Sequence, residues 1–278
     1  EEEHDPYPVD CEYVQAEAWA RLFVEQCDGL FFPGLITFPA GGTENGRGTV
    51  QIGMFDAMHY MYTILRSFLR QGFRRLVIVP SHGPTVLFMH PLLFQMMYDC
   101  KVPLLMLEPM YFFAQKGLVP GRKREAGKKM YWHFKPSSDG EGLGSHAMML
   151  GAYQICGRLA DIPVAGDVDD PEGERLQREG WELNHWFPEH DILNECSSVH
   201  APAPYFYKHT YEHSGFELPA TREELRREAD AGEAYMRSLI SQADLTEHLG
   251  ILRKLDRYIQ DEVMPAVGDH LPENRWSY

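Results

Sequence analysis

The chain of 278 residues has no apolar run that approaches the ~20 residues required to span a membrane as a helix. It also lacks a surplus of positive charge, because 26 Lys and Arg stand against 41 Asp and Glu, which gives a formal net charge of −15. Nucleic acids and anionic membrane surfaces attract proteins with a surplus of Lys and Arg. We therefore expect neither a nucleic acid nor a membrane among the partners.

Cysteine is scarce and shows no paired spacing. The five cysteines are odd in number and include no Cys-x-x-Cys pair; they are Cys11, Cys27, Cys100, Cys156 and Cys196. This pattern is typical of reduced thiols in a cytosolic protein. The acidic N-terminal residues also differ from a secretory signal peptide. We expect a cytoplasmic protein.

A phosphate-binding loop is missing as well. The glycines at 41, 42, 46 and 48 are not followed by Lys-Ser/Thr and do not have the spacing of a dinucleotide-binding turn. A nucleotide cofactor is therefore not expected.

Apolar runs with strand and helix periodicity alternate along the first 160 residues. The spacing predicts helices over 14–27, 54–71, 86–99 and 145–159, and strands over 30–36, 76–80 and 103–108. Right-handed β-α-β crossovers would build a parallel sheet with helices on both faces. The sequence thus predicts an α/β fold of three layers (αβα) with a mainly parallel central sheet, in a single domain over 1–278.

Three further segments complete the expected domain. Residues 110–140 have no clear period and are expected to form a long loop. Residues 163–215 are expected to form an insertion, acidic at first and then rich in aromatic residues. These aromatics could form the wall of a pocket for a flat or cyclic substrate, or could pack against a neighbouring subunit. Helices are expected at about 220–262, opened by the capping pattern Thr221-x-x-Glu224.

Two places in the sequence carry residues suited to a metal ion. His82 follows the apolar run 76–79, at the expected carboxyl end of a buried strand, where open α/β sheets place their sites. Glu2, His4 and Asp10 lie together near residue 1. Imidazole nitrogens and carboxylate oxygens are the ligands of many divalent metal centres.

Three motifs occur in the order found in one known family. Glu2-Glu3-His4-Asp5-Pro6 is followed by Asp10, then Gly72-Phe73-Arg74-Arg75 leads to Ser81-His82-Gly83, and Asp139-Gly140-Glu141 precedes Ser145. The set resembles the creatininase (creatinine amidohydrolase) family. The resemblance covers roughly residues 1–160 and 215–240.

The resemblance implies five metal ligands: Glu2, His4, Asp10, His82 and Glu141. Such a set would hold a divalent metal, two ions per subunit (Zn, Mn or Fe), with Asp10 as the bridge. Glu141 would also belong to the catalytic group. In an alternative alignment, His4 occupies the position of the family's second histidine, and other ligands would then precede residue 1.

The sequence departs from the family at the residue proposed to move a proton. Ser138 stands where the family usually has a histidine. His133, beside Trp132, is the nearest candidate for that catalytic role, and the alternative is a loop histidine packed among aromatics.

The resemblance implies a metal-dependent hydrolase that opens a small cyclic substrate by attack of a metal-bound hydroxide on a ring carbonyl. The first expectation is a cyclic amide (C–N) hydrolase. The alternatives are a C–C hydrolase of a cyclic 1,3-diketone, such as a diketo-inositol or a reduced polyhydroxybenzene, and a non-catalytic family member acting as a subunit. The family also implies a homo-oligomer, specifically a hexamer.

Overall fold

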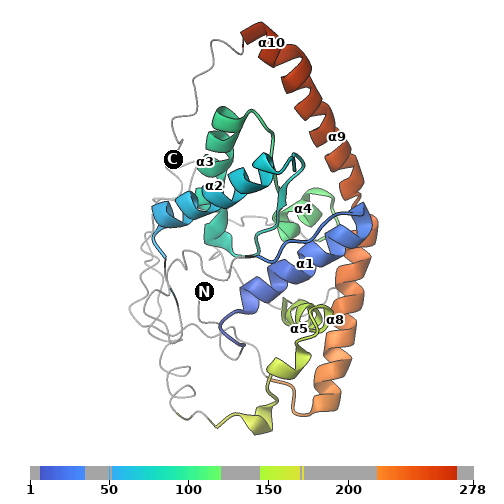
Figure 1. Cartoon of the computed structure of the whole chain (residues 1–278). Helices are drawn as coiled ribbons and strands as arrows, with labels where there is room; N and C mark the ends of the chain where they lie inside the picture. The colour runs from blue at the N-terminus through green and yellow to red at the C-terminus, as the bar shows by residue number, and fades with distance from the viewer. Residues whose placement is uncertain are drawn as a thin grey trace, which may run out of the picture. The chain divides into compact units, whose positions relative to one another are not determined.

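The structure, a computed structural model, describes residues 7–34, 50, 52–119, 145–169, 171 and 218–267. Of these described residues, 69% are helical (Figure 1). The elements in chain order are α1 (Cys11–Cys27), α2 (Met54–Arg70), β1 (Val77–Ile78), α3 (Gly83–Cys100), β2 (Leu105–Met106), α4 (Pro109–Gln115), α5 (Ser145–Ile155), the short 3₁₀ turns η1 (Leu159–Asp161) and η2 (Ala165–Asp167), α8 (Arg222–Gln242), α9 (Leu245–Tyr258), the π-helical η3 (Ile259–Val263) and α10 (Met264–Val267). In this part of the chain, no helix is long and apolar enough to cross a membrane.

The predicted three-layer αβα fold with a mainly parallel central sheet is wrong. Within the described ranges the sheet consists of β1 and β2, which pair in parallel with Val77 opposite Leu105. The predicted strands 76–80 and 103–108 shrink to two residues each, and residues 30–32 form no strand. Strands of a central parallel sheet are buried on both faces, whereas the side chain of Leu30 is 83% exposed. The chain is therefore helix-rich.

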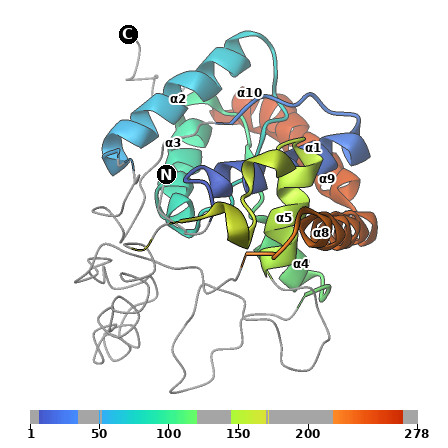
Figure 2. The same ribbon diagram turned by 90° about the horizontal axis from the view of Figure 1, so that it is seen from below.

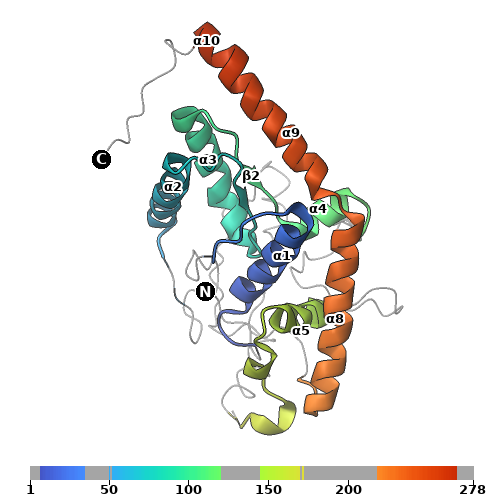
Figure 3. The same cartoon turned by 45° about the vertical axis from the view of Figure 1, so that its right-hand side comes forward.

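The helices follow from the apolar periodicity. In α2 the buried side chains are Ala57, Tyr62 and Leu65, which recur at helical spacing, so the predicted helix over 54–71 is confirmed. The helix ends before Gly72, whose φ of +91° is a conformation that glycine adopts without strain. α2 lies beside α3 (Figures 1 and 3), and the hydroxyl of Tyr62 donates a hydrogen bond to Asp99 at 2.6 Å.

The contacts divide the chain into two compact units. Unit 1 comprises residues 1–15, 34–52 and 131–235, and unit 2 comprises residues 16–33, 53–130 and 236–278. The boundaries fall inside α1 and α8, so each of these helices contributes residues to both units.

Unit 1 is built on the crossing of α5 with α8 (Figure 2). Gly151 of α5 and Gly232 of α8 lie at the crossing, where the absence of Cβ atoms lets the two backbones touch. Met148, Leu150 and Tyr153 of α5 are buried. The Thr221 hydroxyl accepts a hydrogen bond from the Glu224 amide, and the Glu224 carboxylate accepts from the Ala220 amide, so the expected cap reaches one residue further back.

Unit 2 has an aromatic core between α1 and α4. The rings of Trp19 and Phe113 lie 5.1 Å apart, and Phe23 contacts both Phe112 and Phe113. Residues 110–115, which were predicted to lie at the start of a long loop, belong to α4 instead. This short helix forms because the Glu108 carboxylate caps its first amides and because Phe112 and Phe113 are buried.

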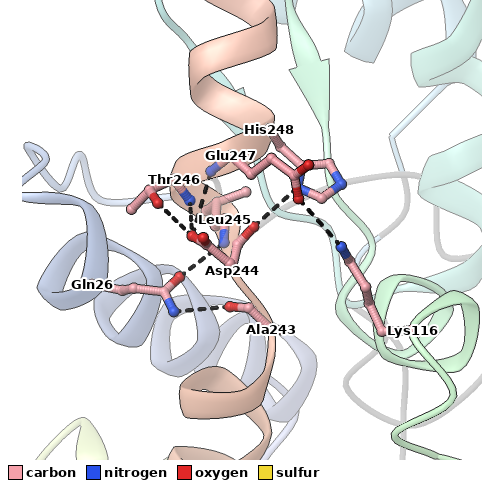
Figure 4. Close-up of polar contacts among 8 residues, drawn as sticks. All are labelled: Gln26, Lys116, Ala243, Asp244, Leu245, Thr246, Glu247 and His248. Carbon is pink, nitrogen blue, oxygen red and sulfur yellow. Dashed lines mark hydrogen bonds and ion pairs between the residues drawn. The ribbon is translucent and has the colours of Figure 1, made fainter.

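Unit 2 also contains the junction between α8 and α9 (Figure 4). The Asp244 carboxylate accepts hydrogen bonds from the amides of Thr246 and Glu247 and so caps α9. The Gln26 side chain donates to the carbonyls of Ile240 and Ala243, both at 2.8 Å, and accepts from the Leu245 amide at 3.1 Å. η3 and α10 continue α9 as one helical run (Figure 3).

Candidate functional site

Two of the six residues predicted to form the site lie in the described part of the chain. Asp10 belongs to unit 1 and His82 to unit 2. Glu2, His4, His133 and Glu141 lie outside the described residues, as does most of the predicted aromatic insertion at 163–215. The ligand set therefore stays a prediction, and each described member is treated in its own surroundings.

His82 lies where β1 passes into α3. It is the N-cap residue of α3, with φ −96° and ψ 126°, and its carbonyl accepts a hydrogen bond from the Thr85 amide at 3.2 Å. Both ring nitrogens are buried. α3 connects β1 to the parallel strand β2, so His82 is at the carboxyl end of the first strand of a β-α-β unit. This is where sheets of this type place ligand-binding residues.

Asp10 lies one residue before α1, and basic and phenolic groups of unit 1 hold its carboxylate. Arg158 donates from Nη1 to Oδ2 at 2.6 Å and from Nη2 to Oδ1 at 3.4 Å, and the Tyr153 hydroxyl donates to Oδ1 at 3.4 Å. The hydrogen bond to Asp10 is the main cause that raises the pKa of Arg158, and burial raises the pKa of Tyr153. Arg158 also pairs with Asp161 at 2.7 Å.

The described donors leave part of the Asp10 carboxylate available to a further partner. An ionised carboxylate offers about four lone pairs. Among the described residues, Oδ1 receives two long contacts and Oδ2 receives one short bond, which is fewer than four. Carboxylates that bind metals are commonly held by such hydrogen bonds. The chemistry of Asp10 is therefore compatible with a metal ligand, and its bridging role stays a prediction.

Sequence reasoning missed a buried polar group in unit 1. The Tyr7 hydroxyl is hydrogen-bonded to Nδ1 of His146, and the other ring nitrogen of His146, Nε2, lies 3.4 Å from a carboxylate oxygen of Glu228. Burial lowers the pKa of His146 to about 4 and raises the pKa of Glu228. A signal for this group exists in the sequence, because His146 directly precedes the apolar run 147–150 of the predicted helix 145–159.

The described ranges hold no group of three or more His, Cys, Asp or Glu side chains placed to bind a metal ion. Comparison with known proteins adds no relative: no family model matches the chain, and no curated protein or solved structure is significantly similar to it. The motifs and the surroundings of Asp10 and His82 are therefore the features that bear on function.

Proposed function

We propose that the protein is a metal-dependent hydrolase that opens a small cyclic substrate, with a cyclic amide as the first substrate class. The observation that carries the proposal is the place of His82 at the carboxyl end of β1, in the parallel unit β1-α3-β2. The motif that contains His82 follows Gly72-Phe73-Arg74-Arg75, the feature in which the chain most resembles the creatininase family.

The β-α-β arrangement supports this proposal through its geometry. The carboxyl ends of parallel strands meet at one edge, and the following helix begins there, so polar residues at this edge are available to a ligand. Residues 76–79 are all apolar, and His82 is the first titratable residue after them. An imidazole is a common ligand of divalent metals such as Zn²⁺.

Five residues would hold the metal: Glu2, His4, Asp10, His82 and Glu141. A bound divalent metal supplies charge that polarises a carbonyl oxygen and lowers the pKa of water. The chain's own contribution at Asp10 is orientation, because Arg158 and Tyr153 fix the carboxylate.

The proton for the leaving atom requires a separate group. We propose His133 for this step, because Ser138 replaces the histidine that the family usually has. C–N cleavage requires an acid for the leaving nitrogen, whereas C–C cleavage of a cyclic 1,3-diketone expels a stabilised enolate. The serine at 138 therefore favours the diketone as the second candidate substrate class.

The test combines metal analysis with a matched pair of variants. Purified protein should contain Zn, Mn or Fe near a stoichiometric amount. Asp10→Asn should lose metal and lower turnover of a panel of cyclic amides by more than about 10³-fold. Asp161→Asn is the control, because Asp161 also pairs with Arg158 but is not a predicted ligand. It should retain both metal and turnover.

Each outcome decides one part of the proposal. Well-folded protein that binds none of the three metals would refute the metal centre. Turnover of cyclic 1,3-diketones in place of the amides would select the C–C hydrolase. Metal-loaded protein that is inactive on both panels would support a non-catalytic subunit. Near wild-type turnover by Asp10→Asn would show that Asp10 is not a ligand.

We also propose that the protein is a homo-oligomer, specifically a hexamer. Large apolar side chains are exposed in unit 2, among them Phe55 at 84% and Phe94 at 75%. Exposed apolar side chains in such number favour association between subunits. Light scattering that gives a mass near 32.0 kDa, the mass of one chain, at micromolar concentration would refute this proposal.

A further inference from the structure

Tyr7 occupies a special place in the sequence of unit 1. It lies three residues after His4 and three residues before Asp10, two of the proposed metal ligands. A fully extended chain covers three residues in about 11 Å at most, so the position of Tyr7 limits where both ligands can lie. Tyr7 is itself buried, with 5% of its surface exposed.

A series of polar side-chain contacts holds Tyr7 in this place. Its hydroxyl is hydrogen-bonded to Nδ1 of His146 in the first turn of α5, and the two rings lie 5.7 Å apart. Nε2 of the same imidazole faces Glu228 of α8 at 3.4 Å. The three side chains come from the N-terminal segment and from two helices of unit 1, and the exposed fraction rises from Tyr7 to His146 to Glu228.

The protonation states follow from burial. Burial raises the pKa of Tyr7 and lowers the pKa of His146, so near neutral pH the phenol keeps its proton and the imidazole is neutral. The phenol then donates to Nδ1, which leaves the imidazole proton on Nε2, facing Glu228. This assignment points the Nε2–H group toward the carboxylate oxygen of Glu228 that lies 3.4 Å away.

We propose that Tyr7, His146 and Glu228 are positioning residues that fix the N-terminal ligand segment on α5 and α8 and thereby set the metal affinity of the site. This inference rests on the proposed function. The segment has a second attachment three residues further on, where Arg158 and Tyr153 hold Asp10. Two attachments on either side of a turn fix its direction as well as its position, and metal ligands require such fixed geometry.

The first experiment removes a single oxygen atom. Tyr7→Phe keeps the buried ring and deletes the hydroxyl that contacts His146. Tyr62→Phe is the matched control, because Tyr62 is also buried (6%) and its hydroxyl also makes a hydrogen bond, to Asp99 in unit 2. Metal-free protein would be titrated with Zn²⁺ against a chromophoric chelator, and circular dichroism would check the fold of each variant.

We expect Tyr7→Phe to bind Zn²⁺ on the order of 10-fold more weakly than wild type, the scale of losing a supporting partner of a metal ligand. Tyr62→Phe should bind as wild type does. Equal affinities in wild type and Tyr7→Phe would overturn the inference while leaving the metal centre intact. Wild type that binds no Zn²⁺, Mn²⁺ or Fe²⁺ would instead refute the proposed function, and with it the positioning role of Tyr7, His146 and Glu228.

A second pair of variants separates anchoring from packing. Asn places a polar atom where Nδ1 of the imidazole lies, so His146→Asn keeps a partner for Tyr7, whereas His146→Leu fills the space with no partner. We expect His146→Asn to retain Zn²⁺ affinity within about 3-fold of wild type and His146→Leu to lose on the order of 10-fold. Equal affinities in these two variants would show that the imidazole acts through its volume alone and would overturn the inference.

Discussion

The substitution Gly232→Ala tests the helix crossing at the centre of unit 1. A Cβ atom on Gly232 would lie 1.7 Å from the carbonyl oxygen of Ala147 and 2.5 Å from its carbonyl carbon. Contacts of real Cβ atoms are essentially never shorter than 3.0 Å, so the missing distance is 3.0 − 1.7 = 1.3 Å. The obstacle is backbone, which cannot rotate away as a side chain can. α5 and α8 must therefore separate by about this distance.

Moving α5 and α8 apart should destabilise the folded protein by more than the higher helix propensity of alanine stabilises it. Forcing extra volume into a packed interior costs about 1–3 kcal/mol, and a clash with backbone belongs at the upper end of that range. Replacing glycine by alanine inside a helix returns up to about 1 kcal/mol. The net expectation for Gly232→Ala is a loss of about 2 kcal/mol in the free energy of unfolding.

The matched control is Gly250→Ala in α9. A Cβ atom on Gly250 meets nothing within 4 Å, so only the gain in helix propensity remains, about 0.5–1 kcal/mol. Urea unfolding followed by circular dichroism measures both variants at one temperature. The two substitutions are chemically identical and should move the unfolding midpoint in opposite directions. A Gly232→Ala variant as stable as Gly250→Ala would show that α5 and α8 do not cross at these glycines.

Three further predictions follow from other parts of the structure. Between pH 6.5 and 4 the unfolded chain protonates His146 while the folded protein does not, so the free energy of unfolding should decrease as the pH is lowered through this window. The decrease should be on the order of 3 kcal/mol, less the opposing effect of Glu228, whose pKa is raised in the folded protein. His146→Asn should flatten this pH dependence, measured by urea unfolding at several pH values. Gln26→Leu deprives the two carbonyls and the amide at the α8–α9 junction of their partner and should cost about 2 kcal/mol. An unchanged urea midpoint would contradict these contacts, of which Figure 4 draws those to Ala243 and Leu245. Glu141→Gln should lose one metal of a pair or weaken metal affinity by about 10- to 100-fold, and retention of two metals with full activity would remove Glu141 from the site.

Local sequence signals located the helices well. The spacing of apolar residues predicted the helix over 54–71, and the helix does end before Gly72, because glycine adopts the positive φ that a helix end requires. The capping pattern at Thr221 correctly marked the start of α8. Such signals are readable because each depends on residues within one or two turns of the chain.

The sheet could not be predicted with the same success. The apolar runs 76–80 and 103–108 did pair in parallel, but only through two residues each, and the run near Leu30 did not join them. An apolar run of five residues satisfies a strand or a helix flank equally well, and its length in the sheet depends on partners that are distant in sequence. The predicted three-layer fold assumed longer strands, and more of them, than the two short strands that pair in the described residues.

The sequence by itself supplied the residue types of the proposed metal site and their order along the chain, together with an acidic composition from which we expect no nucleic acid partner. It also marked His82 as the end of a strand, because an apolar run followed by a small-residue turn is a local pattern. Tertiary structure alone decided that Arg158 and Tyr153 hold Asp10, and that His146 and Glu228 meet Tyr7. Those partners are more than a hundred residues from Tyr7 and Asp10, and the crossing of α5 with α8 brings together the residues that receive Tyr7. Contacts of this kind leave no periodicity in the sequence, since they depend on which helices pack together rather than on the spacing of residues within one.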